Sequence, residues 1–545
     1  MTLVRFVVAL DVGTTGVKCL IVDPDSGPVS MAYVEHRPAR PAPDRVEQDP
    51  AVIGAGIERA IRRALRGTRA YGTVAAIAVT GARATFVCLD RAGRPATPFV
   101  IWQDQRASEI CADVASRYGA ARSFDRSGLP LGPIASASKL RWFADHEPTM
   151  WAGVDCIATA PGFALLALGA ESSVTTPSAA AYVGLLDVRR RTWSDELVAA
   201  FGLPSRVLPT IVAEGTIVGF VSPQVAERTG LPAGTPLVAA PSDWACTLAG
   251  CGALEAGEAA AYLGTGGALG AIVEGPILDE TSGLSCLPAS TEGRYALEGL
   301  LVTGAAPYRW LRDLLTDRAR ERGPVGYARL ERLGRTSRTG SRGVVALPAF
   351  AGVGAPEPDP LARATYAGLG LDTRSGDLVR ATIEGIALDL RILLDAVGRT
   401  ATQVPRLVLT GPPAASGLWS QIVADALEVV VDTVHPADPT ALGAAAVAVV
   451  ALDGVDPATD PSVHARAVRA AVRRMTTRAR SYRPRQADVA VLADVRAIRT
   501  ALARQLREGG THVRLAALRN GRAATNGVAP PDPGEPPDRR MEERP

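Results

Sequence analysis

The sequence contains few of the residues that build metal clusters or disulfide frameworks. Its seven cysteines are scattered along the chain, and no two of them form a Cys-x-x-Cys pair. The five histidines do not stand at the spacing of metal ligands. These absences argue against a structural zinc site and against a secreted disulfide scaffold. Such a chain is typical of a reducing compartment, and we expect a cytoplasmic protein.

The sequence also lacks an excess of either charge and a long hydrophobic run. Its 59 basic and 56 acidic residues give a net charge of +3, which offers no electrostatic basis for binding nucleic acid. The longest run of small apolar residues, 441–452, is too short and too rich in alanine to span a bilayer. The N-terminus lacks the layout of a signal peptide. We therefore expect neither nucleic acid nor a membrane as a partner.

What the sequence does contain is an alternation of short strands and helices. Its 545 residues suit about two to four domains, and a hydrophobic share of 47% allows substantial cores. Segments 74–81, 99–102 and 407–411 are apolar and end in turns, which is typical of strands. Helical patterns are found at 49–65, 420–426 and 487–506. This alternation predicts an α/β architecture.

The most informative segment is a hairpin predicted over residues 7–23. An apolar strand leads into Asp11, a Gly-Thr-Thr-Gly turn follows at 13–16, and the second strand carries Lys18. Backbone N–H groups at such a turn converge on an anion, and an aspartate beside them can hold a hydrated Mg²⁺. The segment is neither a Walker loop nor a dinucleotide fingerprint, because strand rather than helix follows the turn. It predicts a site for nucleotide phosphates, with an ordinary glycine-turn hairpin as the alternative.

A second hairpin, predicted over residues 260–273, repeats this pattern. One strand enters the Gly-Thr-Gly-Gly turn at 264–267, and an apolar strand leaves it. Two such turns, one near the start of each half, suggest two similarly built lobes that face a shared phosphate. Glycine-rich hairpins in two unrelated domains are the alternative.

Asp243 stands where an apolar strand ends and a helix of small residues begins. A carboxylate at a strand end that faces a cleft can take the proton of a substrate hydroxyl as this hydroxyl attacks a phosphoryl group. An aspartate at the same place can instead cap the helix. The sequence leaves both interpretations open.

Two further loops carry candidate ligand contacts. Trp102, Asp104 and Arg106 follow a predicted strand and could offer an apolar face, an acceptor and a forked donor to a polyhydroxylated ligand. A surface salt bridge is the alternative for this loop. Segment 409–417 joins a strand, a turn and a helix N-terminus, which suits an anion or a nucleotide, although two prolines in the turn remove two N–H donors.

Together these segments resemble the FGGY carbohydrate kinases, the family that includes xylulokinase, over residues 5–507. The family's strand-end catalytic aspartate falls on Asp243. Its other motifs are matched in order along the chain: Asp-x-Gly-Thr-Thr-x-x-Lys at 11–18, Trp-x-Asp-x-Arg at 102–106, Lys-Leu-x-Trp at 139–142, Gly-Thr-Ser-Gly (here Gly-Thr-Gly-Gly) at 264–267, Glu-Gly at 384–385, Trp-x-Gln-x-x-Ala-Asp at 419–425 and Ala-Leu-Gly-Ala-Ala at 441–445.

The resemblance implies two actin-like, ribonuclease-H-like lobes around a central cleft. It places a sugar mainly on an N-terminal lobe, residues 1–252, and ATP mainly on a C-terminal lobe, residues 253–507, with a disordered tail at 508–545. The implied activity is ATP-dependent phosphorylation of a sugar or polyol hydroxyl. Asp243 would be the general base and Asp11 would place Mg²⁺, and we expect the two aspartates to meet across the cleft.

The same resemblance assigns the remaining candidate residues. ATP would contact the two turns and the later loop, at Gly13, Thr14, Thr15, Lys18, Gly264, Thr265, Gly266, Gly411 and Ser416. The substrate would contact Arg83, Trp102, Asp104 and Arg106. Closure of the lobes would exclude water, which competes with the sugar as an acceptor.

The chain departs from the family pattern at several positions. Thr-Gly-Ala-Arg at 80–83 replaces the family's Thr-Gly-Gln, and Gly-Pro-Pro at 411–413 replaces its Gly-Gly-Gly nucleotide loop. Family Asp-Tyr and Thr-Asp-x-Ser elements read Pro-Gly at 161–162 and Thr-Thr-Pro-Ser at 175–178. These departures predict a substrate pocket unlike that of xylulokinase. They also motivate an alternative function, a catalytically degenerate member that senses a sugar or a nucleotide.

A third class, an actin-like filament protein, shares the implied fold. The Trp-x-Asp-x-Arg segment and Asp243 argue against it. The sequence does not identify the sugar, the phosphorylated hydroxyl or the oligomeric state, and a homodimer is compatible with it.

Overall fold

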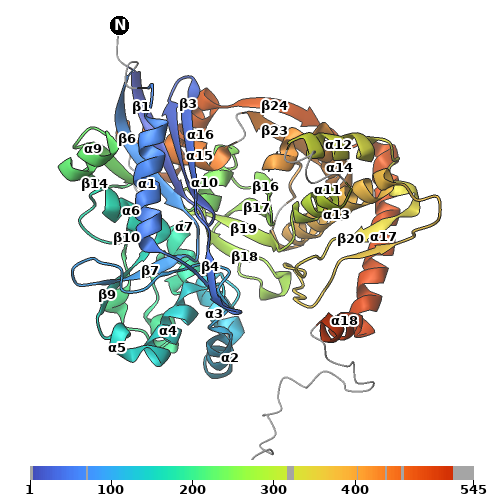
Figure 1. Ribbon diagram of the computed structural model, residues 1–545, viewed down its shortest axis with the longest axis horizontal. Helices are drawn as coiled ribbons and strands as arrows, with labels where there is room; N and C mark the ends of the chain where they lie inside the picture. Colours follow the sequence, from blue (N-terminus) through green and yellow to red (C-terminus); the bar gives the residue numbers. More distant parts are fainter. Residues whose placement is uncertain are drawn as a thin grey trace, which may run out of the picture.

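The computed structural model describes residues 4–68, 72–315, 324–401, 403–435, 438–455 and 460–519. Two large mixed sheets lie side by side, each with helices around it (Figure 1). In the chain, the first sheet ends at Ala239 and the second begins at Ala259. The α/β architecture predicted from the sequence is confirmed.

The first sheet has the strand order β14-β15-β6-β1-β2-β3. β1 is antiparallel to β2 and parallel to β6, and β6 is parallel to β15. The carboxyl ends of three strands therefore meet at one edge of the sheet. The strands are β1 (Val4–Val12), β2 (Gly16–Asp23), β3 (Gly27–Glu35), β6 (Gly72–Gly81), β14 (Ile217–Phe220) and β15 (Pro236–Ala239).

Strand β1 is buried on both faces, which explains why its sequence is a continuous apolar run rather than an alternating one. Val8 and Leu10 join the cluster that includes α1 (Pro50–Ala64) and α6 (Ala160–Leu168). Val7 and Ala9 join a separate cluster with α15 (Pro439–Leu452). One strand thus anchors two cores on opposite sides of the sheet.

The second sheet has the order β18-β19-β17-β16-β22-β23-β24. β16 is antiparallel to β17 and parallel to β22, which is the arrangement of β1 with β2 and β6. The predicted likeness of the two hairpins is confirmed. The strands are β16 (Ala259–Leu263), β17 (Gly267–Glu274), β18 (Ser285–Pro288), β19 (Arg294–Leu301), β22 (Arg406–Thr410), β23 (Val430–His435) and β24 (Thr477–Tyr482).

Helix α15 links the later half of the chain to the first sheet. Its apolar residues pack on β1 and β6 and against α10 (Asp243–Gly250). A Cβ at Gly250 or Gly443 would collide with the backbone of the facing helix, so the close approach of α10 and α15 requires glycine. Within the described parts of the chain, no helix is long and apolar enough to cross a membrane.

A smaller sheet of order β4-β5-β8-β7-β9 extends the first lobe. Its strands are β4 (Ala39–Ala42), β5 (Arg45–Gln48), β7 (Phe86–Asp90), β8 (Phe99–Val100) and β9 (Val154–Thr159). The turn before β7 carries Arg83, and the loop after β8 carries Trp102. This sheet therefore positions the predicted substrate residues.

The C-terminal segment differs in part from the expected disordered tail at 508–545. Helix α17 (Gln486–Glu508) lies along the outer side of the second lobe, and α18 (Thr511–Arg519) follows it (Figure 1). His512 of α18 is buried and lies 2.9 Å from Asp359, which holds this helix to the lobe. The rest of the predicted tail, 520–545, lies outside the described residues.

The remaining elements connect these layers. The strands are β10 (Val174–Thr175), β11 (Leu186–Asp187), β12 (Thr192–Trp193), β13 (Thr210–Ile211), β20 (Val345–Leu347) and β21 (Thr365–Ala367). The α-helices are α2 (Ser108–Arg117), α3 (Ala120–Ser127), α4 (Ser136–His146), α5 (Pro148–Trp151), α7 (Pro177–Ala180), α8 (Asp195–Ala200), α9 (Pro223–Thr229), α11 (Ala306–Leu315), α12 (Pro324–Arg335), α13 (Ser375–Thr400), α14 (Gly417–Leu427) and α16 (Pro461–Met475). Short 3₁₀ helices are η1 (Ala181–Val183), η2 (Ser205–Val207), η3 (Glu280–Ser282), η4 (Ser341–Gly343) and η5 (Pro412–Ala415).

Candidate active site

Asp11 and Asp243 lie at the same edge of the first sheet. Asp11 is near the end of β1, in register with Thr80 of β6, and Asp243 begins α10 after the short loop that follows β15. In the sheet β6 lies between β1 and β15, so the two carboxylates come from strand ends that are one strand apart. The charge of Asp243 contributes to the raised pKa of Asp11, so the two groups interact. Both aspartates thus belong to one lobe, whereas from the sequence we expected them on opposite sides of the cleft.

Asp11 combines burial with an unsatisfied oxygen. Its Oδ1 is buried and has no hydrogen-bond partner among the described residues. Burial and the charges of Asp243 and Asp438 raise the pKa of Asp11 to about 6, against the opposing effect of Lys18. A carboxylate oxygen without a partner suits Mg²⁺, which takes only one or two protein carboxylates and completes its shell with water and phosphate oxygens. The residues present therefore fit this metal.

Lys18 connects the first sheet to helix α15. Its Nζ lies 3.0 Å from Oδ2 of Asp438, the residue that precedes α15. Burial would lower the pKa of Lys18, but the charges of Asp11 and Asp438 raise it above its ordinary value. The side chain is 28% exposed, so the ammonium group stays charged and accessible beside Asp11.

Asp243 is the first residue of α10, and Ser242 takes the N-cap position. The Asp243 carboxylate accepts from the Trp244 N–H at 2.7 Å and lies 3.4 Å from Nε of Arg83. Its side chain is 37% exposed, so a hydroxyl can reach it. Desolvation raises its pKa, although Arg83 and the Trp244 N–H oppose this shift. Asp243 is therefore not the N-cap that the alternative interpretation expected, and its raised pKa suits a proton acceptor.

Residues that the sequence did not assign to the site hold the turn before Asp243. The Ser242 N–H donates to Oγ of Ser178 at 2.8 Å, and the Ser178 N–H donates to Oε1 of Glu214 at 2.9 Å. Thr80 Oγ1 donates to the Pro241 carbonyl at 2.6 Å. Ser178 belongs to segment 175–178, which departs from the family pattern, whereas no local pattern marked Glu214.

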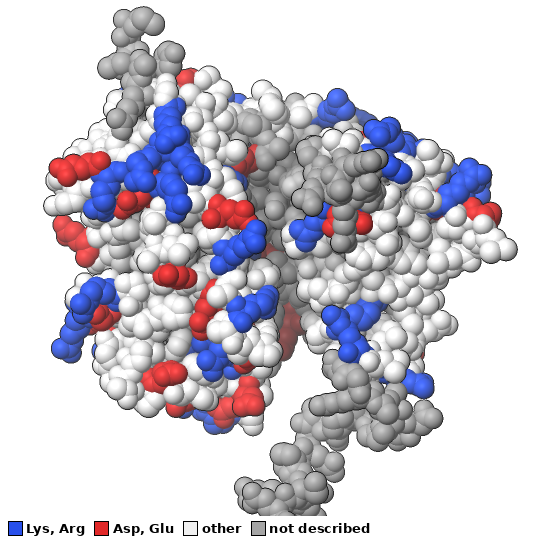
Figure 2. Space-filling model, viewed as in Figure 1, with Lys and Arg blue, Asp and Glu red and all other residues white. Residues whose placement is uncertain are grey.

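Arg83 contacts Asp243 and also reaches the second lobe. Its Nη1 donates to Oε2 of Glu298 at 2.7 Å, and its guanidinium lies over the Tyr182 ring, 4.1 Å from the centroid. Glu298 is on β19, so this ion pair joins the two lobes. Figure 2 shows the surface hollowed between these lobes. Sequence reasoning missed Glu298 and Tyr182, because neither belongs to a quoted motif.

The first predicted phosphate turn is closed and braced beside Asp11. The Gly13 N–H donates to the Gly16 carbonyl at 3.0 Å, which closes the turn. Trp102 Nε1 donates to Oγ1 of Thr14 at 3.1 Å, and the Thr15 and Tyr33 hydroxyls share a hydrogen bond of 3.1 Å. The threonine hydroxyls are thus fixed in place before any ligand binds.

The second predicted phosphate turn is also closed by a backbone hydrogen bond, but it is one residue shorter. The Gly264 N–H donates to the Gly266 carbonyl at 2.8 Å, and the Gly304 N–H donates to the Thr265 carbonyl at 3.0 Å. A Cβ at Gly264 would overlap the Tyr262 ring, so the turn and this ring are in close contact.

The later loop reaches this second turn through Gly411. Gly411 has φ +91°, and a Cβ there would collide with the backbone of Leu263, just before the turn. Ser416 has a different place: it is the N-cap of α14, and its Oγ accepts from the Trp419 N–H at 3.3 Å. The structure therefore brings Gly411 to the turn and uses the Ser416 side chain to start a helix.

Asp104 and Arg106 are buried and bind each other, whereas from the sequence we expected them to face a ligand. Asp104 is fully buried, and its carboxylate accepts from Nε and Nη2 of Arg106, each at 2.8 Å, and from the Val46 N–H at 2.7 Å. The pair is therefore not a surface salt bridge, and its carboxylate is engaged inside the chain, whereas the predicted substrate contact stays a prediction. It fastens the loop to β5 and so positions Trp102, which is 42% exposed.

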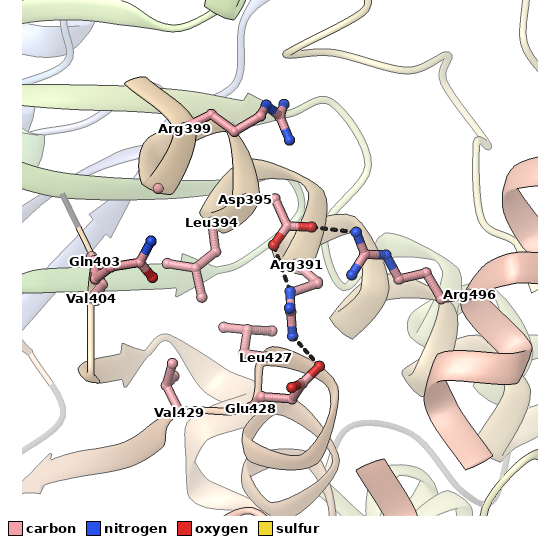
Figure 3. Close-up of a pocket in the computed structure, with 11 residues that line it drawn as sticks. Arg391, Leu394, Asp395, Arg399, Gln403, Val404, Leu427, Glu428, Val429 and Arg496 are labelled. Atoms are coloured by element: carbon pink, nitrogen blue, oxygen red, sulfur yellow. Dashed lines mark hydrogen bonds and ion pairs between the residues drawn. The ribbon is translucent and has the colours of Figure 1, made fainter. Parts of the chain in front are cut away.

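A separate pocket of about 550 Å³ lies on the second lobe and contains none of these residues (Figure 3). It is lined by α13, the segment after it, the end of α14 and α17. Arg391 donates to Asp395 at 2.7 Å and to Glu428 at 2.6 Å, and Arg496 donates to Asp395. These four side chains neutralise one another, and Arg399 gives the lining one net positive charge.

Comparison with known proteins agrees with this geometry. Residues 6–250 match the model of the FGGY family of carbohydrate kinases, N-terminal domain, and residues 259–452 match its C-terminal domain. A glycerol kinase of Myxococcus xanthus is 32% identical over 454 residues, which cover 81% of this chain and 89% of that protein.

Solved structures show the same fold. A gluconate kinase and a ligand-bound xylulose kinase, both from Lactobacillus acidophilus, each superpose with a TM-score of 0.83 at 22% identity. Each comparison covers 92% of this chain and 98% of the other. These likenesses confirm the predicted two-lobed, actin-like architecture.

Proposed function

Because the chain belongs to the FGGY family of carbohydrate kinases, we propose that it transfers the γ-phosphoryl group of ATP to a hydroxyl of a sugar or polyol, with Asp243 as the general base. The observation that carries this proposal is the meeting of Asp243 and Asp11 at one sheet edge, next to the first braced glycine turn. One carboxylate is open to a hydroxyl, and the other retains a free oxygen for a metal.

On the acceptor side, Asp243 accepts the proton that the hydroxyl loses as its oxygen forms a bond to the γ-phosphorus. The bond from that phosphorus to the bridging oxygen breaks, and ADP leaves with the electron pair. The raised pKa of Asp243 supports this role, since a carboxylate with a higher proton affinity is a stronger base. Arg83 lies close enough to orient the carboxylate.

On the phosphate side, we propose that Asp11 holds Mg²⁺ and that the two turns hold phosphate oxygens. Mg²⁺ neutralises the charge that phosphates bring to such a site. No group of three or more His, Cys, Asp or Glu side chains in the described ranges could hold a metal unaided, so this metal would need oxygens of the nucleotide. Lys18, Thr14 and Thr265 stand beside Asp11 or on the turns as further contacts.

The finer assignments follow from the same proposal. The sugar would bind mainly to residues 1–252, and ATP mainly to residues 253–507, including Gly264, Gly266 and Gly411. Glycerol is the first acceptor to examine, because the curated relative described above is a glycerol kinase. Xylulose is the second, as the resemblance suggested.

A coupled ADP-release assay with the full chain, ATP and Mg²⁺ tests the proposal. We expect turnover with at least one acceptor among glycerol, xylulose, other ketoses and pentitols. Absence of turnover on all of them, with folded protein, contradicts it. Calorimetric titration with ATP and Mg²⁺ then tests the alternative sensor function: sugar binding without ATP binding, as Pro412 and Pro413 would favour, identifies a degenerate member.

A further inference from the structure

Glu298 accepts a hydrogen bond from Nη1 of Arg83, the residue that also contacts Asp243. The two side chains are 2.7 Å apart, and only 12% of Arg83 and 3% of Glu298 are exposed. A buried carboxylate of this kind is stable only with a close cationic partner. The pair therefore forms a fixed part of the site wall rather than a loose surface contact.

Tyr182 contacts both members of this ion pair. Its ring lies under the Arg83 guanidinium, and its hydroxyl donates to Oε2 of Glu298 at 3.4 Å. Asp243 receives the weaker contact of Arg83, 3.4 Å from Nε. The guanidinium is thus held mainly by Glu298 and Tyr182, which keeps it from closing fully on the general base.

The charges of this group determine which acceptors fit. An arginine fork without a partner is a good receptor for a carboxylate, because two parallel N–H groups match its two oxygens. Here Nη1 already donates to Oε2 of Glu298 and Nε lies beside Asp243, so no pair of adjacent N–H groups is left without a contact. Arg83, Glu298 and Asp243 together carry one net negative charge, so a carboxylate on the acceptor would meet repulsion from two carboxylates that already share the guanidinium.

We propose that Glu298 is a specificity-determining residue that restricts the acceptor to neutral polyhydroxy compounds and excludes carboxylate-bearing ones such as aldonates. This inference rests on the proposed function, whose acceptor it narrows. Glu298 also positions Arg83: without it, Arg83 would pair with Asp243 alone and weaken the base.

Matched acceptor pairs test this inference. Glycerol and glycerate differ only in a CH₂OH group that becomes a carboxylate, and so do sorbitol and gluconate. The affinities of all four are measured by calorimetry in the presence of ATP and Mg²⁺, together with kcat and KM for each acceptor that is turned over. The native chain should favour the neutral member of at least one pair by about a hundredfold, because like charges in such a site are strongly disfavoured.

Glu298→Gln removes the charge and keeps the shape. We expect it to reduce this preference by roughly tenfold or more, mainly by improving the KM or Kd of the anionic member, as expected when a repulsive group is removed. Glu298→Ala should in addition lower kcat on the neutral member. If Glu298→Gln does not fold, Tyr182→Phe tests the same claim, because it loosens Glu298, and a smaller shift in the same direction is expected.

Glu384→Gln is the matched control. Glu384 is equally buried, lies in the same lobe and pairs with Arg380 at 2.8 Å, but it is in α13 and belongs to no part of the site. It should leave the preference unchanged. An unchanged preference in Glu298→Gln, or native affinities that are equal within each pair, overturns the inference. Failure of the proposed function is distinct from both, since it appears as absent ADP release while the binding preference is still measured.

Discussion

At the scale of single residues, two aspartates at one sheet edge differ through their surroundings. Asp11 is enclosed, keeps one oxygen without a partner and has Lys18 as its nearby cation. The Asp243 side chain is 37% exposed and lies against Arg83, which is itself held by Glu298. The first environment suits a metal ligand, and the second suits a proton acceptor.

Protonation of Asp11 should compete with Mg²⁺. The pKa of Asp11 is raised to about 6, so below that pH the carboxyl is increasingly protonated and a weaker ligand. We expect kcat/KM at fixed Mg²⁺ to fall as the pH drops through this range. Raising the Mg²⁺ concentration should move the acidic limb to lower pH. If Asp11 holds no metal, its protonation cannot depend on Mg²⁺, and Asp11→Asn should then leave both the acidic limb and the Mg²⁺ requirement unchanged.

Glu214 should make stability depend on pH. Burial raises its pKa from 4.5 to about 7, so the folded state keeps its proton to a higher pH than the unfolded chain does. The stability contributed by the bound proton is complete below the unfolded pKa and is lost as pH rises through the folded one, a loss of roughly 2 kcal/mol between pH 5 and pH 8.

The side chain introduced by Glu214→Gln cannot ionise, so the variant should not lose this stability as the pH rises. The melting temperature of the variant, relative to the native chain, should be higher at pH 8 than at pH 5. Asp113→Asn, on an exposed face of α2, serves as the control and should show no such difference. Equal shifts at both pH values show that Glu214 is not the titrating group.

At the scale of elements, hairpins were predictable and long-range contacts were not. The two glycine turns, helix α1 and the strands β6 and β22 follow from local patterns of apolar and turn residues. The burial of Asp104 with Arg106 could not be predicted from such a pattern, because a polar pair has the same local sequence on a surface or in a core. The role of Glu298 could not be predicted from local sequence either, since its partner Arg83 comes from the other half of the chain.

The contact between α10 and α15 should not tolerate a side chain. A Cβ at Gly443 would overlap the backbone of Cys246, which cannot move without displacing the helix that carries Asp243. Gly443→Ala should therefore lower the free energy of unfolding by about 1–3 kcal/mol, as overpacking does. Chemical denaturation measures this. Gly54→Ala, in α1 with open space around it, should be neutral or stabilising.

At the scale of the whole molecule, the two lobes are joined by a helix that belongs to the later half of the chain and packs on the first sheet. Helix α15 follows the second sheet's β23 in the chain but packs on the first sheet, where it covers Val7, Ala9 and Ala78. The predicted boundary at 252–253 separates the two central sheets, yet it cuts the first sheet from one of its covering helices. The division into lobes is thus a proposal about binding roles rather than about independent folding.

Truncation tests this coupling. A fragment of residues 1–252 would expose the face of the first sheet that α15 covers, and such a large apolar patch favours aggregation. We expect the fragment to be insoluble or to lack cooperative unfolding. A monomeric fragment with a sharp thermal transition would show instead that the first lobe folds alone.

The most direct measurement of the central claim is single-turnover phosphoryl transfer by Asp243→Asn, with Asp113→Asn as the matched control. Loss of a general base should slow the chemical step by about a hundredfold or more, while the affinities for ATP and acceptor change little. The control should react at the native rate. A native rate in Asp243→Asn, with the acceptor bound and phosphorylated as before, would contradict the account.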